Sequence, residues 1–539
     1  MLHKLLDRLR PAAAEATPGT FPGGVHPPEQ KLTAAAPIEQ CPLPPVLILP
    51  LKQHIGEACA PLVDVGDFVL LGQKIAKSQG YVSASVHAPA SGKVVKIEEH
   101  PIPHPSGMGR PCIFIEPDGE DTVDESLEPM PDYRNKDAPT IRERIRVCGI
   151  VGLGGAVFPS FIKIARDQRN PIDTVILNGI ECEPYLTNDH RLMLEKPEEI
   201  LRGMDIIMHA VNAKHGIIAI EDNKPDAINI MHQMMGVMSD IDAANISIRI
   251  LPTRYPQGGE KQLIEALTGR EIPAGRLPLH IGMLCQNVGT AKAIHDAVCL
   301  GRPLTERVVT VSGDAVPRPG NVCARIGTPV PFLFGLHGLH DMDDVRVIHG
   351  GPMMGERLPK LDVPVVKSTN GLLAMKRDTL YSEQAVEEPC IRCGHCVEVC
   401  PAGLVPNELA WHCRNDQFDR GQEYDLFDCI ECGCCSYVCP SHIPLVHYFR
   451  YAKGQVAKID KELEFARISK IRSEARDNRL ARERAERAAR RSKAKQQHKA
   501  ALADKTTDKA ADKTDDKTED VQAAGTSTNA GKNNGDENV

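Results

Sequence analysis

Eight cysteines in the last third of the chain repeat one spacing. In each copy, two residues separate successive members of a cysteine triplet, and a fourth cysteine follows after three more residues, directly before a proline. The copies are Cys390, Cys393, Cys396 and Cys400, and then Cys429, Cys432, Cys435 and Cys439. Three thiolates on a short loop, with a fourth from farther away, are the ligand pattern of a [4Fe–4S] cluster. The spacing therefore predicts two such clusters, each of which passes one electron at a time.

In two-cluster ferredoxins, the fourth cysteine of each run ligates the other cluster. We therefore expect one cluster on Cys390, Cys393, Cys396 and Cys439, and the other on Cys429, Cys432, Cys435 and Cys400. Structural zinc is the main alternative, but zinc sites take four ligands as two pairs. Disulfides are less favoured, because no secretory signal precedes the motifs and such clusters are usually assembled in the reducing cytosol. Cys434 is an additional thiol for which the pattern predicts no role.

The composition narrows the class of protein. The chain has 539 residues, 42% of them hydrophobic, which is enough for three or four domains with buried cores. Its net charge of −8 gives no nucleic-acid signature. No run approaches the roughly 20 apolar residues of a membrane-spanning helix, and residues 1–10 lack an apolar signal core. We therefore expect an intracellular protein that can dock on a membrane.

Two N-terminal segments, residues 1–45 and 46–125, precede the parts of the chain that carry the chemistry. Residues 1–45 are rich in proline and alanine, which indicates an ordered arm rather than a helix. Residues 46–125 alternate short β-type runs with glycine turns and resemble the barrel-sandwich fold of biotinyl and lipoyl domains. Those domains carry a modified lysine at a hairpin tip, whereas residues 78–86 contain no lysine, and Gly80 and Tyr81 occupy the tip. We expect a structural module rather than a swinging arm.

A glycine-rich stretch, residues 148–163, precedes a β-type run at residues 174–177. Glycines let backbone N–H groups approach a phosphate, and a following helix start adds a favourable dipole. Asn178, Glu181 and Glu183 come directly after the run, at the carboxyl end of a strand, where open α/β sheets bind ligands. Each feature alone has a plainer interpretation, such as a glycine turn without ligand or solvent-facing acids. Their joint order favours a ligand site.

At these residues the sequence resembles a known family. Gly-x-Gly-Gly-Ala-x-Phe-Pro-x-x-x-Lys from Gly152, and Asn-x-x-Glu-x-Glu-Pro from Asn178, are similar to the FMN- and NADH-binding subunit of respiratory complex I and related hydrogenases. The resemblance continues at residues 255–261 and 286–290. The order of arm, barrel-sandwich module, flavin domain and tandem cluster motifs is closer still to the C subunits of Rnf (also called Rsx) electron-transport complexes. This likeness covers roughly residues 15–455.

The resemblance implies roles for twelve residues. Gly152, Gly154, Gly155 and Lys163 would hold the FMN phosphate and the isoalloxazine edge. Asn178 and Glu181 would contact the flavin or its ribityl chain. Phe158, Glu183 and Glu260 would receive the nicotinamide nucleotide, the aromatic ring by stacking and the carboxylates on ribose hydroxyls. Tyr255, Gly258 and Asn287 would close the flavin pocket.

The same resemblance implies the remaining architecture. Residues 135–300 would form a Rossmann-like FMN/NADH-binding α/β domain, and residues 305–375 a small β-grasp domain. Residues 380–455 would form an α-helical, ferredoxin-like module with two [4Fe–4S] clusters. From residue 456 to 539, charged residues at helical spacing indicate a solvated helix, and the last forty or so residues are of a low-complexity composition typical of disorder.

The expected activity is electron transfer between NADH and a low-potential carrier such as ferredoxin, because flavin converts between hydride transfer and single electrons. The resemblance adds a peripheral position on the cytoplasmic face of the inner membrane, in a complex whose other subunits couple electron flow to ion movement. Val157 and Ile180 depart from the complex I pattern, which has a glycine and an acid there. These departures leave open an electron-relay adaptor without a working nucleotide site. A soluble hydrogenase or dehydrogenase subunit is a third, less favoured hypothesis.

Overall fold

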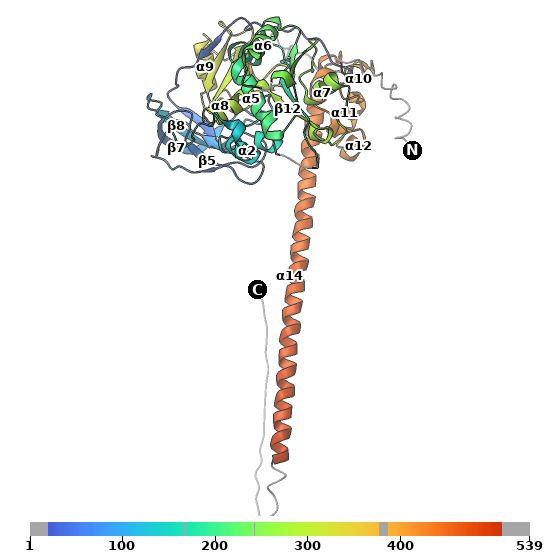
Figure 1. Cartoon of the computed structure of the whole chain (residues 1–539). Coiled ribbons are helices and arrows are strands. Elements are labelled where there is room, and N and C mark those ends of the chain that lie inside the picture. Colours follow the sequence, from blue (N-terminus) through green and yellow to red (C-terminus); the bar gives the residue numbers. More distant parts are fainter. Residues whose placement is uncertain (1–19, 166–168, 242, 377–385, 509–539) are drawn as a thin grey trace, which may run out of the picture. The chain divides into compact units, whose positions relative to one another are not determined.

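The computed structural model describes residues 20–165, 169–241, 243–376 and 386–508 (Figure 1). The chain divides into two compact units, residues 1–456 and residues 457–539. Within the described ranges, none of the helices is both long and apolar enough to cross a bilayer. The domain bounds expected from the sequence stay predictions, and the elements below are given as the structure has them.

Two small sheets enclose one core in the first part of the chain. The larger contains β2 (Leu47–Pro50), β8 (Gly109–Pro117), β7 (Gly92–Pro101) and β4 (Phe68–Val69), in that order. The smaller contains β3 (Ala60–Pro61), β5 (Lys74–Lys77) and β6 (Val86–His87). Residues from both sheets, such as Leu49, Ile75 and Ile113, are fully buried in the shared core. The arrangement is the barrel sandwich that the sequence predicts.

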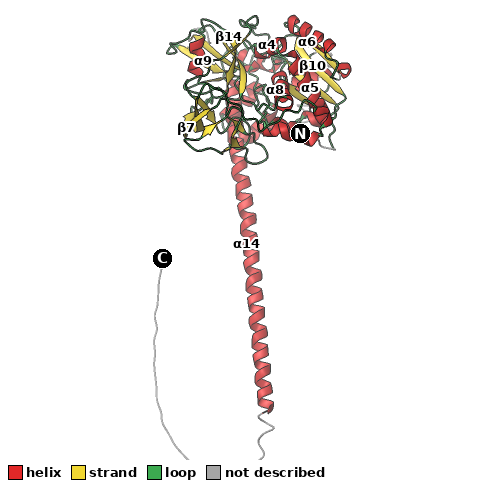
Figure 2. Cartoon of the chain, turned by 60° about the vertical axis from the view of Figure 1, so that its left-hand side comes forward, coloured by secondary structure: helices red, strands yellow, loops and turns green. Residues whose placement is uncertain are grey.

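A second domain, here called the parallel-sheet domain, is built on four parallel strands in the order β11-β10-β9-β12. The strands are β9 (Thr174–Gly179), β10 (His215–Glu221), β11 (Ile246–Leu251) and β12 (Met283–Asn287). The helices are α2 (Ala138–Val147), α3 (Ser160–Lys163), α4 (Asn188–Glu195), α5 (Pro197–Val211), α6 (Pro225–Val237), α7 (Glu260–Thr268) and α8 (Val288–Cys299). Figure 2 shows α5, α6 and α8 beside β10.

Helices cover both faces of this sheet, which explains its unbroken apolar strands. Val175 and Leu177 pack into the cluster that contains α5 and α8, while Ile176 between them packs with α7 on the opposite face. Numbered by their order in the chain, the strands lie 3-2-1-4 across the sheet. From β9 the chain continues to β10 on one side, whereas β12 lies on the other side of β9, so the strand order reverses between β9 and β12. The carboxyl ends of these two strands therefore border the crevice where such sheets bind ligands.

A third domain, here called the mixed-sheet domain, has six strands in the order β1-β14-β13-β17-β15-β16. They are β1 (Ile38–Gln40), β14 (Gly320–Arg325), β13 (Glu306–Ser312), β17 (Gly371–Lys376), β15 (Val345–His349) and β16 (Glu356–Arg357). Helix α9 (Val330–Leu336) places Val330, Leu333 and Phe334 in its core. The five strands from residues 306–376 are compatible with a β-grasp domain, and that assignment stays a prediction.

The N-terminal arm joins three domains. Its strand β1 pairs in parallel with β14 of the mixed-sheet domain. Upstream of it, the Gly24 N–H donates to the Val399 carbonyl (2.9 Å), and Val25 pairs with Tyr255 of the parallel-sheet domain. The expectation of an ordered arm is met in its described part, because the arm adds a strand and bridges elements that are distant in sequence.

The cysteine motifs lie in a small helical domain, here called the cysteine domain. Its helices are α10 (His395–Glu398), α11 (Pro406–Arg414), α12 (Phe418–Glu423), α13 (Cys434–Tyr437) and the start of α14 (Leu445–Asp508). The two motifs repeat the same turn. Arg392 and Glu431 have φ of 55° and 57°, and Gly394 and Gly433 have φ of 85° and 83°. Both loops therefore curl in the same way before a one-turn helix.

Helix α14 begins in the cysteine domain, where Leu445, Phe449 and Ala452 occupy the core at helical spacing. From residue 457 it belongs to the second unit, and its described side chains there are nearly all exposed, as expected for a sequence that is polar on every face. The segment predicted to be disordered lies mostly outside the described residues, and its first part is helical as far as Asp508.

Candidate cofactor site and metal centres

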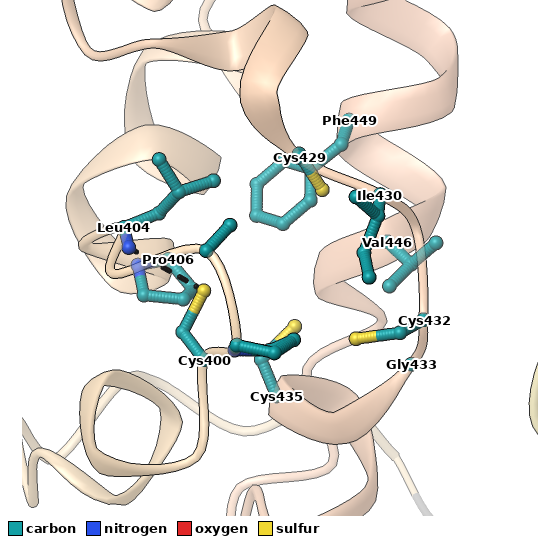
Figure 3. Close-up of a pocket in the computed structure, with 12 residues that line it drawn as sticks. Cys400, Leu404, Pro406, Cys429, Ile430, Cys432, Gly433, Cys435, Val446 and Phe449 are labelled. Carbon is teal, nitrogen blue, oxygen red and sulfur yellow. Dashed lines mark hydrogen bonds between the residues drawn. The ribbon is translucent and has the colours of Figure 1, made fainter. Parts of the chain in front are cut away.

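Four cysteine sulfurs face one cavity in the cysteine domain (Figure 3). The cavity is lined by Cys400, Cys429, Cys432 and Cys435 and by apolar residues that include Leu404, Ile430, Val446 and Phe449. Burial raises the pKa of the Cys429 thiol to about 11, and its neighbours Cys432 and Cys400 add to the rise. The structure thus brings together one of the two expected ligand sets, in which Cys400 of the first motif joins Cys429, Cys432 and Cys435 of the second.

This arrangement fits a cluster better than a single ion. Among the described residues, no group of three or more His, Cys, Asp or Glu side chains is placed to hold one metal ion. A cubane keeps its ligands farther apart than one tetrahedral zinc does, because each thiolate binds a different iron. The thiol donors and the apolar wall around them therefore suit a [4Fe–4S] cluster.

The other predicted ligand set lies closer to solvent. Cys390 and Cys393 are exposed, and Cys396 is half-buried. Burial raises the pKa of Cys396, and the nearby Cys390 and Cys393 thiols raise it further, so these three lie together. Ser441 Oγ donates to the Pro389 carbonyl (3.1 Å), which brings the segment just after Cys439 beside the start of the first motif. Both ligand sets stay predictions at the level of single residues.

The glycine loop lies at the crevice of the parallel-sheet domain. Asn178 lies at the carboxyl end of β9, next to its register partner Asn287 on β12. A Cβ on Gly154 would stand 3.4 Å from the Asn287 Cβ, so the loop packs directly on this residue. The Leu153 N–H donates to Thr290 Oγ1 (2.8 Å), which anchors the loop to the first turn of α8. The loop and the two asparagines are therefore brought together as expected.

Helix α8 points its N-terminus at this crevice. Asn287 caps it, with Oδ1 accepting from the Gly289 N–H (2.8 Å). Asn178 Nδ2 donates to the Gly258 carbonyl (2.9 Å), which ties a third predicted residue to the same place. A twelve-residue helix that begins beside a glycine loop offers N–H groups and a positive dipole end to a phosphate. The crevice therefore has the features of an FMN phosphate site.

Lys163 and Glu260, for which the resemblance implies separate roles, form an ion pair. Lys163 Nζ lies 2.7 Å from Glu260 Oε2 and 3.3 Å from the Cys285 carbonyl of β12. Burial alone would lower the pKa of Lys163, but the Glu260 carboxylate outweighs it, so the pKa is raised. The ammonium is therefore held charged near the sheet edge, as a phosphate ligand requires.

Glu181 and Glu183 turn into the protein, so the interpretation as solvent-facing acids is wrong. Glu181 is buried and accepts from the backbone N–H groups of Asp189 (2.8 Å) and His190 (3.3 Å) at the start of α4. Glu183 accepts from Met353 N–H (3.1 Å) and Met354 N–H (2.8 Å), which belong to the mixed-sheet domain. Burial raises the pKa of Glu183 to about 7. Both carboxyl groups thus have partners within the protein.

Two charged residues near the crevice, Asp189 and Lys31, have no signal in the sequence motifs. Asp189 accepts from Asn287 Nδ2 (2.6 Å), and burial followed by the charge of Glu181 raises its pKa to about 7. Lys31 of the arm donates to three carbonyls of the loop after β9, at 2.6, 2.9 and 2.7 Å. The polar run that contains Asp189 could have indicated a helix start, but the pairing of Lys31 depends on residues 150 positions away.

Two predicted residues make contacts within the protein that their expected roles do not include. Tyr255 is 1% exposed, and its hydroxyl donates to the Cys432 carbonyl (2.6 Å) of the cysteine domain. Because the hydroxyl is engaged there, only the ring of Tyr255 remains to close the flavin pocket, and that role stays a prediction. Phe158 is half-buried, and its carbonyl accepts from the Gly152 N–H (2.8 Å), which closes the glycine loop.

Comparison with known proteins agrees with this geometry. Residues 145–296 match the Nuo51 FMN-binding domain, residues 19–120 the RnfC barrel sandwich hybrid domain, and residues 385–443 the 4Fe-4S dicluster domain. One solved structure, an NAD+-reducing [NiFe]-hydrogenase in the H2-reduced state, covers 59% of this chain and 62% of its own, with 18% identity and a TM-score of 0.44. That likeness is too weak to support an argument.

Curated relatives give the family. The C subunit of the ion-translocating oxidoreductase complex of Pectobacterium atrosepticum is 46% identical over 488 residues, covering 90% of this chain and 68% of the relative. The corresponding protein of Yersinia pestis is 47% identical, with 86% and 73% covered, and that of Pseudomonas aeruginosa is 48% identical, with 87% and 60% covered. The chain therefore belongs to the family of C subunits of ion-translocating oxidoreductase complexes, with an FMN-binding domain and a 4Fe-4S dicluster domain.

Proposed function

We propose that this protein carries electrons between NADH and a low-potential carrier such as ferredoxin, through FMN and two [4Fe–4S] clusters. The proposal includes a position on the cytoplasmic face of the inner membrane, where other subunits couple electron flow to ion movement. The proposal is supported mainly by the presence of a candidate flavin site and a candidate cluster site in the same compact unit, residues 1–456. A crevice with the features of a phosphate site and an apolar cavity with four thiols lie in the same unit, and Tyr255 contacts Cys432 of the cavity.

FMN would be held at the switch point of the parallel sheet. The loop containing Gly152, Gly154 and Gly155 supplies N–H groups, and the N-terminus of α8 supplies a dipole, for the phosphate. Lys163 supplies the positive charge if its pairing with Glu260 loosens. Asn178 and Asn287 are register partners on neighbouring strands. Asn178 fixes the loop of Gly258 and Asn287 caps α8, so both shape the walls of the flavin site. The bound flavin would supply the conversion between a two-electron hydride and single electrons.

The departures at Val157 and Ile180 are compatible with flavin binding. Val157 has φ of 43°, in the left-handed region that a glycine would adopt, so the loop keeps the conformation implied by the family pattern. Ile180 is 6% exposed and packs with Ala219 and Leu263 in the sheet's core.

NADH would enter beside Phe158, with Glu260 and Glu183 as ribose partners. Glu183 is engaged by the backbone of Met353 and Met354, so it can reach a nucleotide only after this loop moves. This engagement favours the second candidate, a relay adaptor that has clusters but no working nucleotide site. The two candidates differ in whether NADH reduces the clusters of this chain.

The experiment is an anaerobic titration of the purified, cluster-loaded protein with NADH in the presence of FMN, followed by visible absorbance. Bleaching of the flavin and cluster bands together supports NADH entry at this protein. Bleaching by dithionite but not by NADH rules out that entry and supports the relay adaptor. The Glu183→Gln variant serves as the matched test, because it should slow reduction by NADH and leave reduction by dithionite unchanged.

A further inference from the structure

Tyr255 is a side chain of the parallel-sheet domain that reaches a predicted cluster ligand. Its hydroxyl donates to the Cys432 carbonyl at 2.6 Å, and its side chain is 1% exposed. Its backbone exchanges two hydrogen bonds with Val25 of the arm, at 2.8 and 3.0 Å. Both ends of the residue are therefore held, and the hydroxyl cannot turn to water.

The surroundings of this contact are tightly packed. Tyr255, Cys432, Cys434 and Val25 form one buried apolar cluster. A Cβ on Gly433 would stand 2.8 Å from the Met353 carbonyl, so the loop of the mixed-sheet domain presses on the same cysteine loop. Loss of the tyrosine hydroxyl would leave the carbonyl of the buried residue Cys432 without that donor.

Other contacts join the same two domains without reaching a ligand. Gln262 Nε2 donates to the Pro401 carbonyl (3.4 Å), and Lys261 lies 3.6 Å from Asp428. These contacts hold the domains together next to the cluster cavity. Removing the hydroxyl of Tyr255 would therefore change the environment of Cys432 while the domain contact persists.

We propose that Tyr255 is a positioning residue for the cluster of Cys400, Cys429, Cys432 and Cys435, which holds Cys432 in place and makes this cluster easier to reduce. The proposal rests on the cluster assignment within the proposed function. The hydroxyl hydrogen is the positive end of a dipole, and it points at the peptide of a ligand residue in an apolar site. Positive ends of dipoles and hydrogen bonds around a cluster favour the form that carries the additional electron.

The test is a redox titration of the whole, cluster-loaded chain carrying Tyr255→Phe, followed by electron paramagnetic resonance. One of the two cluster signals should shift to a more negative midpoint potential, while the other stays at its wild-type value. At the wild-type midpoint of the shifted cluster, the ratio of reduced to oxidised cluster should fall on the order of a few-fold, as expected for one hydrogen bond. Dithionite and mediators set the potential, so the result does not depend on NADH or FMN.

The matched control is Tyr133→Phe, which removes another buried tyrosine hydroxyl of the parallel-sheet domain, one that donates to Asp205. It should leave both cluster signals unchanged. The proposal is overturned if Tyr255→Phe lowers only the thermal stability and both signals keep their wild-type potentials and line shapes. Site-specific 3-fluorotyrosine at position 255 preserves the fold and strengthens the donor, so it should shift the same cluster the opposite way. An unchanged potential in that protein also overturns the proposal.

Discussion

Replacement of Cys400 by alanine tests the crossed ligation directly. Cys400 belongs to the first motif in sequence but lines one cavity with Cys429, Cys432 and Cys435 of the second. A [4Fe–4S] cluster contains four irons, so the intact chain should bind about eight irons and Cys400→Ala about four. Iron and sulfide analysis of the anaerobically purified protein, with spin counting after reduction, measures both values.

Two double variants decide which cluster is lost. If Cys400 serves the cluster of the second motif, Cys400→Ala combined with Cys432→Ala should still retain about four irons, because both changes affect the same cluster. Cys400→Ala combined with Cys393→Ala should lose nearly all iron. An uncrossed arrangement exchanges these two results, and that exchange would refute the assignment.

Cys434→Ala provides the matched control. This thiol is fully buried next to Cys432 and lies outside both predicted ligand sets. The variant should keep about eight irons and both spin signals. Loss of one cluster in this control would show that any cavity created at this loop disrupts assembly, and iron loss in the other variants would then not identify ligands.

Three further predictions concern charged residues around the crevice. Lys163→Met should weaken FMN binding by about 10- to 100-fold through loss of a charge-assisted hydrogen bond, whereas Glu260→Gln should not weaken it. Quenching of flavin fluorescence measures the affinity. Equal losses in the two variants would mean that the ion pair alone matters. The pKa of Glu183 is raised from 4.5 to about 7, so its contribution to stability is complete below pH 4.5 and is lost as the pH rises through 7. In denaturation experiments from pH 5.5 to 8.5, the free energy of unfolding should fall more steeply for the wild type than for Glu183→Gln. Parallel curves would contradict this prediction. Lys31→Met leaves three carbonyls without their donor and should lower the free energy of unfolding by about 2–4 kcal/mol, whereas the exposed Lys52→Met should leave denaturation unchanged.

The parts that sequence predicts best are those in which local spacing is dictated by chemistry. A cubane needs its thiolates on a tight loop, so the triplets of cysteines identify the cluster loops without knowledge of the fold. The same holds for the strand before Asn178, because a short apolar run that ends in polar residues suits a buried parallel strand. These features depend on neighbours a few residues away.

The directions of Glu181, Glu183 and Tyr255 could not be predicted in this way. Glu183 turns toward Met353 and Met354, which are 170 and 171 positions away, and the Tyr255 hydroxyl meets a carbonyl 177 positions away. A family pattern indicates that such residues stand near a ligand site. Which partner each one takes is decided by how separate domains pack, and short-range patterns carry no information about that.

The arm that joins three domains has a consequence for synthesis of the protein. Its residues leave the ribosome before the residues that they bind. The Thr33 carbonyl accepts from Asn321 Nδ2, 288 positions later, and the Gly24 N–H donates to the Val399 carbonyl. Domains generally fold in the order in which they are translated. The arm is therefore made before its partners, and it docks fully only after residues 321 and 399 have emerged. A chain stopped before residue 399 keeps the partners of the arm at Tyr255 and β14 but lacks the Val399 carbonyl that Gly24 binds.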